Sequence, residues 1–319
     1  MRIVDLDGHG LNPGDLSWTG FEQLGDFKTY DLTEEDDQLI LERIGDAEIV
    51  LTNKTPLDRQ VITNAPNIKY IGVQATGYNV VDTAAAKEKG IIVTNVPSYS
   101  THEVAQHTLA LLLEITNLVG MHATAVSQGE WTDTDSFTFW KKPLISLTGK
   151  IFGMIGFGNI AQATAKLAHA FGMEVVFYNH RPKEFSEPWL KQVSLEELYA
   201  QADIISLHVP QTAETTKMIN KAAIDKMKSG VILLNTARGG LLDEQAVADG
   251  LNVGKIYALG ADVVSEEPIK ADNPLLAAKN AYLTPHIAWA PTAARQRCMD
   301  IAVNNLQSFL NGQPKNVVG

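Results

Sequence analysis

The sequence predicts an α/β protein with two parallel-sheet domains, and three observations lead to that fold class. Short runs of β-branched and apolar residues alternate with helical patterns along almost the whole chain, as in parallel strands joined by crossover helices. The 319 residues are too many for one typical core and suit two domains. Hydrophobic residues make up 45% and charged residues 20%, which is an ordinary globular balance.

Charge and cysteine content narrow the function classes. A net charge of −11 argues against nucleic acid and against an anionic membrane surface as partners, because both need clustered Lys and Arg. Cys298 is the single cysteine, so no internal disulfide can form and we expect a cytoplasmic protein. Residues 1–7 contain acids where a signal peptide would be apolar, and the apolar run 109–113 is too short to span a bilayer.

The first hundred residues predict one sheet of flavodoxin-like type. Thr33 and Asp36 resemble a capping box at the start of a helix, and the acidic run 34–37 suits a solvated first helical turn better than a binding patch. The five predicted strands are residues 2–6, 27–31, 48–52, 68–73 and 91–95.

The rest of the chain predicts a second βα series. A long, largely buried helix is expected over residues 101–121, followed by a segment without periodicity over 127–147. Ser194 and Glu197 form another capping-box pattern, and a last helix over 292–310 follows the completed series. The six predicted strands are residues 150–155, 174–178, 203–208, 231–235, 256–262 and 281–284. We therefore expect two α/β domains with a cleft between them.

A glycine-rich turn at residues 156–161 is the strongest local motif. Gly156 permits a tight turn after an apolar strand, Gly158 lets the backbone approach a pyrophosphate closely, and Ala161 is small enough for close packing of the helix on the strand. Asn159 and Ile160 open that helix, whose N-terminal N–H groups would bind the pyrophosphate. The motif predicts a Rossmann-type cofactor domain, although a glycine turn without a ligand is the simpler alternative.

The end of the next strand bears on which cofactor is used. Folds that prefer NAD place an acid there to hold the ribose 2′-hydroxyl, whereas this sequence has Asn179, His180 and Arg181. No carboxylate repels a 2′-phosphate, and Arg181 could pair with one, so we favour NADP(H) over NAD(H). The alternative is that Asn179 serves the hydroxyls while Arg181 is a solvated surface residue.

Three motifs in the second half resemble the D-isomer-specific 2-hydroxyacid dehydrogenase family. They are residues 235–240, 262–268 and 284–289, and each lies at or just beyond a predicted strand end, where open α/β sheets bind ligands. Glu267 follows Arg238 by 29 residues, and His286 follows Glu267 by 19. Both spacings match the family, and the resemblance covers essentially the whole chain.

The resemblance implies a catalytic set of Arg238, Glu267 and His286, and the chemistry of these residue types agrees. Arg presents a rigid fork of donors that suits the carboxylate of a 2-oxo acid. His can donate a proton to the keto oxygen during reduction and accept it in the reverse direction. A carboxylate beside the imidazole favours its protonated form and fixes its tautomer. Glu267, immediately before Pro268 as in the family, fits this role better than the adjacent Glu266.

Other histidines and an apparent metal motif offer alternatives. His208 is the best rival for catalysis, although its place in the His208-Val209-Pro210 run suits a cofactor-lining role. His102, Glu103 and His107 look like a zinc-protease helix, but a five-residue gap turns the two histidines about 140° apart. We therefore predict no metal. The cofactor contacts that the resemblance adds are Thr108, His208, Val209, Pro210, Thr236, Ala237, Arg238, Asp262 and His286.

For the substrate, the resemblance implies backbone N–H groups at Gly77 and Tyr78, where a plain glycine turn is the alternative. Residues 53–56 are a weaker candidate for lining the same cleft. The family fold also implies a substrate domain of residues 1–99 and 288–319, a dinucleotide-binding domain of residues 100–287, and usually a homodimer. Sequence periodicity indicates neither the discontinuous domain nor the dimer.

Segments 97–101, 131–140 and 286–289 look most like the glycerate dehydrogenase or hydroxypyruvate reductase branch. We therefore expect reduction of hydroxypyruvate, and of glyoxylate, to D-glycerate and glycolate. Trp289 could form a wall of a small substrate pocket or belong to dimer packing. Lactate-type and other 2-oxo acids are alternative substrates. A non-catalytic, dinucleotide-sensing corepressor is the alternative from a different class.

Overall fold

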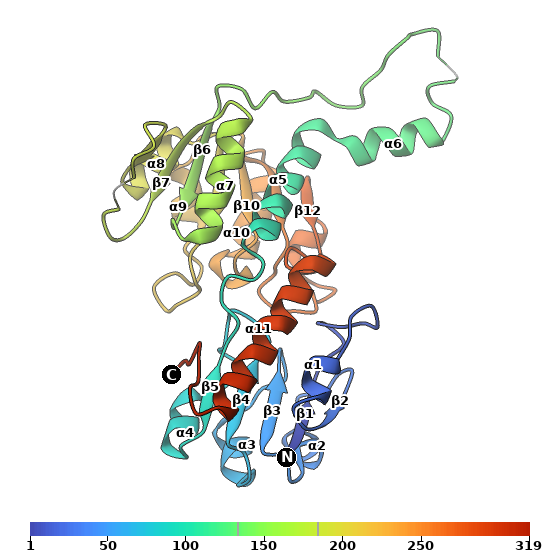
Figure 1. The fold of residues 1–319 in the computed structure, drawn as a ribbon. Coiled ribbons are helices and arrows are strands. Elements are labelled where there is room, and N and C mark those ends of the chain that lie inside the picture. Colours follow the sequence, from blue (N-terminus) through green and yellow to red (C-terminus); the bar gives the residue numbers. More distant parts are fainter. Residues whose placement is uncertain (133, 184) are drawn as a thin grey trace. The chain divides into compact units, whose positions relative to one another are not determined.

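The computed structural model describes residues 1–132, 134–183 and 185–319. The chain forms two compact units (Figure 1). The first unit consists of Met1–Ser100 together with Trp289–Gly319, and the second of Thr101–Ala288. Each unit has its own parallel sheet, so the α/β fold class is confirmed.

The first unit has a five-stranded parallel sheet in the order β2-β1-β3-β4-β5, which confirms the flavodoxin-like prediction. Side chains alternate between its two faces, so Ile3 packs toward one core and Val4 toward the other. The strands are β1 (Arg2–Asp5), β2 (Asp26–Thr29), β3 (Ile49–Thr52), β4 (Tyr70–Val73) and β5 (Ile92–Thr94).

Helices cover both faces of this sheet. The helices on one face are α2 (Asp37–Ile44), α3 (Arg59–Asn64) and α4 (Thr83–Glu88). The other face is covered by α1 (Thr19–Glu22) and by the C-terminal helix α11 (Thr292–Leu310), which lies along β4. The predicted last helix over 292–310 is thus confirmed, and it closes the core of the first unit through Cys298 and Leu306.

The start of α2 differs from the predicted capping box. The Asp36 carboxylate accepts a hydrogen bond from the backbone N–H of Leu39, so Asp36 is the N-cap. Thr33 is buried, and its hydroxyl donates to the carbonyl of Leu6 instead. The prediction for Thr33 is therefore wrong, because a long-range hydrogen bond to the end of β1 outweighs the local cap. Glu34 and Glu35 are exposed ahead of the helix.

The second unit has a seven-stranded parallel sheet in the order β12-β11-β10-β9-β6-β7-β8. This is the Rossmann order with one extra strand at the β12 edge. The strands are β6 (Ile151–Ile155), β7 (Glu174–Tyr178), β8 (Leu190–Gln192), β9 (Ile204–Leu207), β10 (Val231–Asn235), β11 (Ile256–Ala261) and β12 (Ala281–Leu283). The sequence did not predict β8, because this three-residue edge strand is incompletely buried and has no apolar period.

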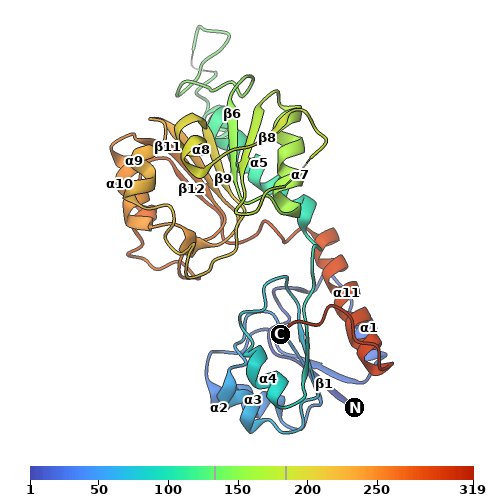
Figure 2. The same cartoon turned by 90° about the vertical axis from the view of Figure 1, so that its left-hand side faces the viewer.

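Helices pack in two layers on this sheet (Figure 2). One layer is α5 (Thr101–Asn117) and α7 (Asn159–Ala170), and the other is α8 (Leu195–Gln201), α9 (Lys221–Lys226) and α10 (Glu244–Asn252). Two short 3₁₀ helices are η1 (Gly239–Leu241) and η2 (Pro274–Leu276). The capping box of Ser194 and Glu197 at the start of α8 is confirmed.

The predicted long helix over 101–121 is interrupted. α5 ends at Asn117, Leu118 takes a left-handed conformation with φ 51°, and α6 (Val119–Ser127) leaves at a bend of 58°. Burial of the Leu118 side chain offsets the roughly 1–2 kcal/mol cost of that backbone conformation. No single helix in the described parts of the chain is long and apolar enough to cross a membrane, and α5 with α6 passes that test only as this bent pair.

Candidate dinucleotide and catalytic site

The turn between β6 and α7 contains two glycines that are required for different reasons. Gly156 has φ +89°, and a Cβ there would lie 2.5 Å from the carbonyl oxygen of His208. Gly156 is therefore required by the protein's own backbone. A Cβ on Gly158 would meet no atom of residues 1–132, 134–183 or 185–319 within 4 Å, so packing among these residues does not explain this glycine.

The open space above Gly158 fits a bound pyrophosphate. Gly158 is the N-cap of α7, a helix of 12 residues, and no side chain from the described part of the chain caps it. Asn159 and Ile160 form the first turn, and Ala161 is fully buried against the sheet. The turn lies between β6 and β9, where the strand order reverses and where such sheets bind ligands. These residues fit a dinucleotide whose phosphates meet the helix N-terminus.

The loop after β7 is held by a residue that the sequence analysis missed. Gln192, on β8, donates to the carbonyl oxygens of Asn179 and Arg181, while the Asn179 side-chain amide also donates to the Arg181 carbonyl. Arg181 and His180 are exposed, and no carboxylate in the described ranges pairs with Arg181. Lys183, also missed, donates through Nζ to the carbonyl of Phe157 at 2.7 Å, inside the glycine-rich turn.

His208 follows β9 and differs sharply from a general acid. Its Nε2 lies 2.9 Å from the Ser206 hydroxyl, and burial lowers the pKa of the imidazole to about 3. At this pKa the imidazole is uncharged at physiological pH, so it lacks the acidic imidazolium proton that a general acid donates. Val209 lies against Gly156, and Pro210 is exposed at the start of the following loop. The position suits contact with a cofactor at the turn.

The loop after β10 carries Arg238, and the side chain of a buried residue at the end of the strand holds its backbone. Buried Asn235 accepts from the N–H of Ala237 and donates to the Arg238 carbonyl. The Thr236 hydroxyl lies 2.9 Å from that of Thr108 on α5. Arg238 is exposed, donates to the Ala237 carbonyl, and has no carboxylate within ion-pair distance in the parts of the chain described. Its guanidinium is therefore available to an anionic ligand.

A close backbone contact joins the Arg238 loop to the Glu267 loop. A Cβ on Gly239 would lie 1.8 Å from the carbonyl carbon of Val264, so only glycine fits there. The N–H of Val264 in turn points at Oε1 of Glu267 at 3.4 Å. The loops after β10 and β11 thus lie against one another.

Glu267 and His286 form the central pair of the site. Oε2 of Glu267 lies 2.6 Å from Nδ1 of His286, and the two side chains are 32% and 26% exposed. A carboxylate at this distance accepts the Nδ1 proton and leaves Nε2 as the nitrogen that can exchange a proton with a ligand. His286 itself is in a left-handed conformation with φ 55°.

Asp262 lies beneath His286 and is almost fully buried. Burial alone would raise the pKa of Asp262, but hydrogen bonds from His107, Thr284 and the N–H groups of Ile287 and Ala288 outweigh it and hold the pKa below its ordinary value. The residue is therefore a buried carboxylate that organises the turn after β12.

The predicted substrate loop of the first unit follows β4. Gly77 is half-buried and Tyr78 is 41% exposed. Thr76 anchors the loop, because its hydroxyl donates to the Val96 carbonyl and its own carbonyl accepts from the Asn95 amide. Trp289 packs edge-on against Tyr99, with ring centroids 6.5 Å apart.

The weaker candidate, residues 53–56, is already engaged by a side chain of the same unit. The Asp7 carboxylate accepts from the N–H of Asn53 and of Thr55, each at 2.7 Å, and from that of Lys54. Asp7 is 5% exposed. These three N–H groups therefore bind an internal anion, which leaves the loop at Gly77 and Tyr78 as the candidate for the substrate carboxylate.

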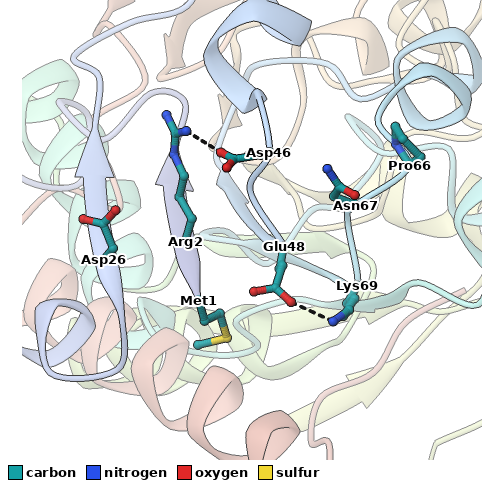
Figure 3. A pocket seen from close by; sticks show the side chains of 8 residues that line it. All are labelled: Met1, Arg2, Asp26, Asp46, Glu48, Pro66, Asn67 and Lys69. Atoms are coloured by element: carbon teal, nitrogen blue, oxygen red, sulfur yellow. Dashed lines mark hydrogen bonds and ion pairs between the residues drawn. The ribbon is translucent and has the colours of Figure 1, made fainter.

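One hollow lies at the opposite, amino-terminal end of the strands in the first unit (Figure 3). Its charged side chains pair with each other, as in Arg2 with Asp46 and Lys69 with Glu48. Because the predicted site loops of that unit follow the carboxyl ends of the strands, the hollow is remote from them. Within the described ranges, no group of three or more His, Cys, Asp or Glu side chains could hold a metal ion.

The fold and site together define a class: a two-unit α/β oxidoreductase with a nicotinamide dinucleotide as cofactor. The profile of the "D-isomer specific 2-hydroxyacid dehydrogenase, NAD binding domain" matches residues 109–288. The chain therefore belongs to the D-isomer-specific 2-hydroxyacid dehydrogenase family.

Relatives of known name agree with this family. The chain is 53% identical to a hydroxypyruvate reductase of Blautia hydrogenotrophica, covering 100% of this chain and 99% of the relative. It is 37% identical to a glycerate dehydrogenase of Methylorubrum extorquens, covering 99% and 98%. A solved structure of an acyclic imino acid reductase in complex with NADPH and D-Arg matches over 100% of both chains, with a TM-score of 0.86 and 28% identity.

Proposed function

We propose that this protein reduces hydroxypyruvate, and also glyoxylate, to D-glycerate and glycolate with a nicotinamide dinucleotide. The observation that carries the proposal is the 2.6 Å pair of His286 and Glu267 at the strand ends. Arg238, without a carboxylate partner in the described structure, lies on the adjoining loop. The names of the two relatives support the substrate class.

Each residue of the set has a distinct role in this reaction. Arg238 binds the carboxylate and keto oxygen of the substrate through its fork of N–H donors. His286 donates the Nε2 proton to the keto oxygen as negative charge develops there, and takes it back from the hydroxyl in the reverse direction. Glu267 accepts a hydrogen bond from Nδ1–H and so orients the ring. When bound, the dinucleotide supplies the hydride that reaches the substrate carbon.

The two units divide the work in this proposal. Residues 100–287 bind the dinucleotide and residues 1–99 with 288–319 bind the substrate, where the N–H groups at Gly77 and Tyr78 receive the carboxylate. Trp289 serves as a wall of the pocket that limits substrate size. The remaining assigned cofactor contacts are Thr108, Gly156, Gly158, Asn159, Ile160, Asn179, His180, Arg181, His208, Val209, Pro210, Thr236, Ala237, Asp262 and His286.

For the cofactor, the proposal favours NADPH over NADH. Asn179 replaces an acid at the end of β7, and Arg181 is exposed with no acidic partner in the described chain. Arg181→Ala should lower the ratio of kcat/KM with NADPH to that with NADH about 10-fold or more, because a charge-assisted contact is lost. Binding of adenosine 2′,5′-bisphosphate and 5′-AMP should show the same change. An unchanged ratio would remove Arg181 as the discriminator.

We also propose that the protein is a homodimer, with a second copy covering the apolar arm formed by α6 and the segment after it. The exposed large apolar side chains of this arm are Val119, Val126, Trp131, Phe137, Trp140 and Leu144. Exposed large apolar side chains in this number favour a protein–protein interface. Light scattering of Trp140→Glu and Phe137→Asp should show monomers with an intact fold. Dimers in both variants would place the interface elsewhere.

The first experiment follows oxidation of NADPH and NADH with hydroxypyruvate, glyoxylate, pyruvate and phenylpyruvate in parallel. Turnover should be fastest with hydroxypyruvate, and His286→Ala should reduce it about 10²- to 10⁴-fold, the usual contribution of a general acid. Dinucleotide binding without turnover of any acid would instead support a sensor of the corepressor type. A preference for pyruvate would make it a lactate-type enzyme.

A further inference from the structure

Two consecutive residues of α5 contact two different catalytic loops. Thr108 meets Thr236 on the loop that carries Arg238. His107 points its Nε2 at the Thr284 hydroxyl, 3.0 Å away, on the loop that carries His286. The same nitrogen lies 3.5 Å from Oδ1 of Asp262. One helix therefore touches the supports of both proposed catalytic side chains, and nothing in the proposed function uses His107.

The direction of the His107 hydrogen bond follows from counting donors. The Thr284 hydroxyl has one proton, and it donates that proton to Oδ1 of Asp262 at 2.6 Å, because a carboxylate can only accept. The hydroxyl oxygen, 3.0 Å from Nε2 of His107, then accepts from this nitrogen, which also faces Oδ1 of Asp262. The imidazole of His107 therefore carries a proton on Nε2.

The Asp262 carboxylate, which accepts from Thr284, also accepts from the backbone of the turn that carries His286. Oδ1 accepts from the N–H of Ile287 at 2.9 Å, and Oδ2 from that of Ala288 at 2.7 Å. The Asp262 carbonyl accepts from the N–H of His286 at 2.8 Å. These bonds fix the left-handed backbone of His286, a conformation that costs about 1–2 kcal/mol and persists only where its surroundings hold it.

We propose that His107 is a positioning residue for His286, acting through Thr284 and Asp262. The proposal rests on the proposed role of His286 in proton transfer. The Nε2–H of His107 holds the Thr284 hydroxyl toward Asp262, so that the carboxylate keeps both N–H groups of the turn and the His286 ring keeps its alignment with Glu267. Loss of that donor lets the turn relax and moves Nε2 of His286 away from the reacting oxygen.

If His107 only fills space, the substitutions that the protein tolerates at this position differ from those expected for a hydrogen-bond donor. The His107 side chain is 20% exposed and lies between α5 and the β12 loop. If it only filled space, Leu would replace it well. If it acts as a donor, Gln should replace it, because the Gln side-chain amide reaches near the position of Nε2. The comparison of His107→Leu with His107→Gln therefore separates the two roles.

The experiment compares both variants with wild type and with His102→Leu, an exposed histidine on the same helix about 140° away. His107→Leu should lower kcat about 10- to 100-fold, the scale expected for a misplaced catalytic group, with the Kd of NADPH within about twofold. His107→Gln should recover most of kcat, and His102→Leu should match wild type. Thr284→Val should reproduce the loss, and the His107→Leu, Thr284→Val double variant should add little to it.

A second measurement does not depend on activity. In the protein without cofactor, the ¹⁵N signals of the His286 ring should show a fixed Nδ1–H tautomer in wild type and His107→Gln. They should move toward those of a freely averaging imidazole in His107→Leu. Unchanged signals and kcat in His107→Leu, or equal losses in the Leu and Gln variants, would overturn the proposal. Absence of turnover in wild type would overturn the proposed function alone, and the ring signals would still decide this inference.

Discussion

At the residue scale, the two glycines of the β6–α7 turn show how one motif mixes structural and ligand-binding demands. Gly156 has a left-handed backbone and lies against His208, so the fold itself needs it. Gly158 has ordinary backbone angles and open space around it. The two glycines are thus required for different physical reasons, and variants at each position can distinguish those reasons.

Gly158→Ala should leave the free energy of unfolding within about 1 kcal/mol of wild type, because the added methyl group meets no atom of the described residues. It should weaken dinucleotide binding at least about 10-fold, because that methyl group occupies the space for the pyrophosphate. Gly156→Ala should instead lose about 2 kcal/mol or more of stability. Calorimetry of unfolding and of NADPH binding measures both. Equal cofactor affinity in Gly158→Ala and wild type would contradict the assignment.

The Glu267 carboxylate should hold the orientation of the His286 ring. Its Oε2 lies 2.6 Å from Nδ1, so Glu267→Leu, which removes the acceptor, should lower kcat about 10- to 100-fold, the scale expected for a misplaced catalytic group. Glu267→Gln, whose amide oxygen can still accept from Nδ1–H, should keep more of the activity. The measurement is kcat for hydroxypyruvate in the two variants and wild type. Wild-type activity in Glu267→Leu would contradict the role.

Asp5 should make the first unit less stable at alkaline pH. Burial, with a smaller contribution from the charge of Asp7, raises the pKa of Asp5 to about 8. The folded state therefore keeps a proton that the unfolded state releases near pH 4, and the stability from it is lost as pH rises from about 4 to about 8. The slope should reach about 1.4 kcal/mol per pH unit.

Asp5→Asn removes that titration and can still accept from the Gln74 amide. We expect its unfolding free energy to be nearly flat over this range and to exceed that of wild type at pH 8. Denaturant unfolding at pH 5, 6.5 and 8 tests this. Parallel curves for the two proteins would mean that Asp5 is ionised in the folded state.

At the element scale, side chains of the strands hold the loops at the carboxyl ends of the sheets. Asp7 after β1 holds the loop after β3, and Gln192 on β8 holds the loop after β7. Because β1 pairs with β3 and β8 with β7, both supports come from a neighbouring strand. Asn235, at the end of β10, instead holds the Arg238 turn that follows its own strand.

Asp7→Asn should loosen the loop over 53–55. The Asn amide has one acceptor oxygen where the carboxylate has two, and its NH₂ group would face a backbone N–H of the loop. This loss of hydrogen bonding should cost about 1–3 kcal/mol of stability. Hydrogen exchange at the N–H groups of Asn53 and Thr55 should accelerate accordingly. Asp82→Asn, which alters the cap of α4, serves as the control and should leave those two amides unchanged. Wild-type exchange in Asp7→Asn would refute the internal-anion assignment.

At the scale of the whole molecule, a discontinuous first unit is completed by the C-terminal helix. Residues from both ends of the chain share one core, which contains Leu11 and Leu306. Arg295 on α11 adds an ion pair with Asp15 and a hydrogen bond to the Leu11 carbonyl. The second unit is continuous from Thr101 to Ala288 and has its own core. The two units therefore need not unfold in one step.

Cofactor binding should stabilise the second unit selectively. NADPH at about 100 times its Kd adds about 2.7 kcal/mol to the unfolding free energy of the unit that binds it. We expect calorimetry to show a raised Tm for one transition only, with NADH less effective than NADPH at equal concentration. A uniform shift of all transitions would point to unfolding as a single cooperative block.

The sequence by itself determined most of the long strands and the last helix, and it named the candidate site residues. Short β-branched and apolar runs place the long strands, and a helical pattern places the last helix, within a few residues, because these elements are largely buried. The glycine turn and the motifs around Arg238, Glu267 and His286 were found because chemistry and close backbone approach restrict their residue types.

Tertiary structure alone decided what depends on contacts between distant segments. Thr33 bonds to Leu6 rather than capping a helix, Leu118 ends α5 because its burial offsets a strained backbone, and β8 exists only as an edge paired with β7. The link from His107 through Thr284 and Asp262 to the His286 turn joins residues more than 150 positions apart. No local pattern contains such a link, because its energy comes from three-dimensional proximity rather than from neighbours along the chain.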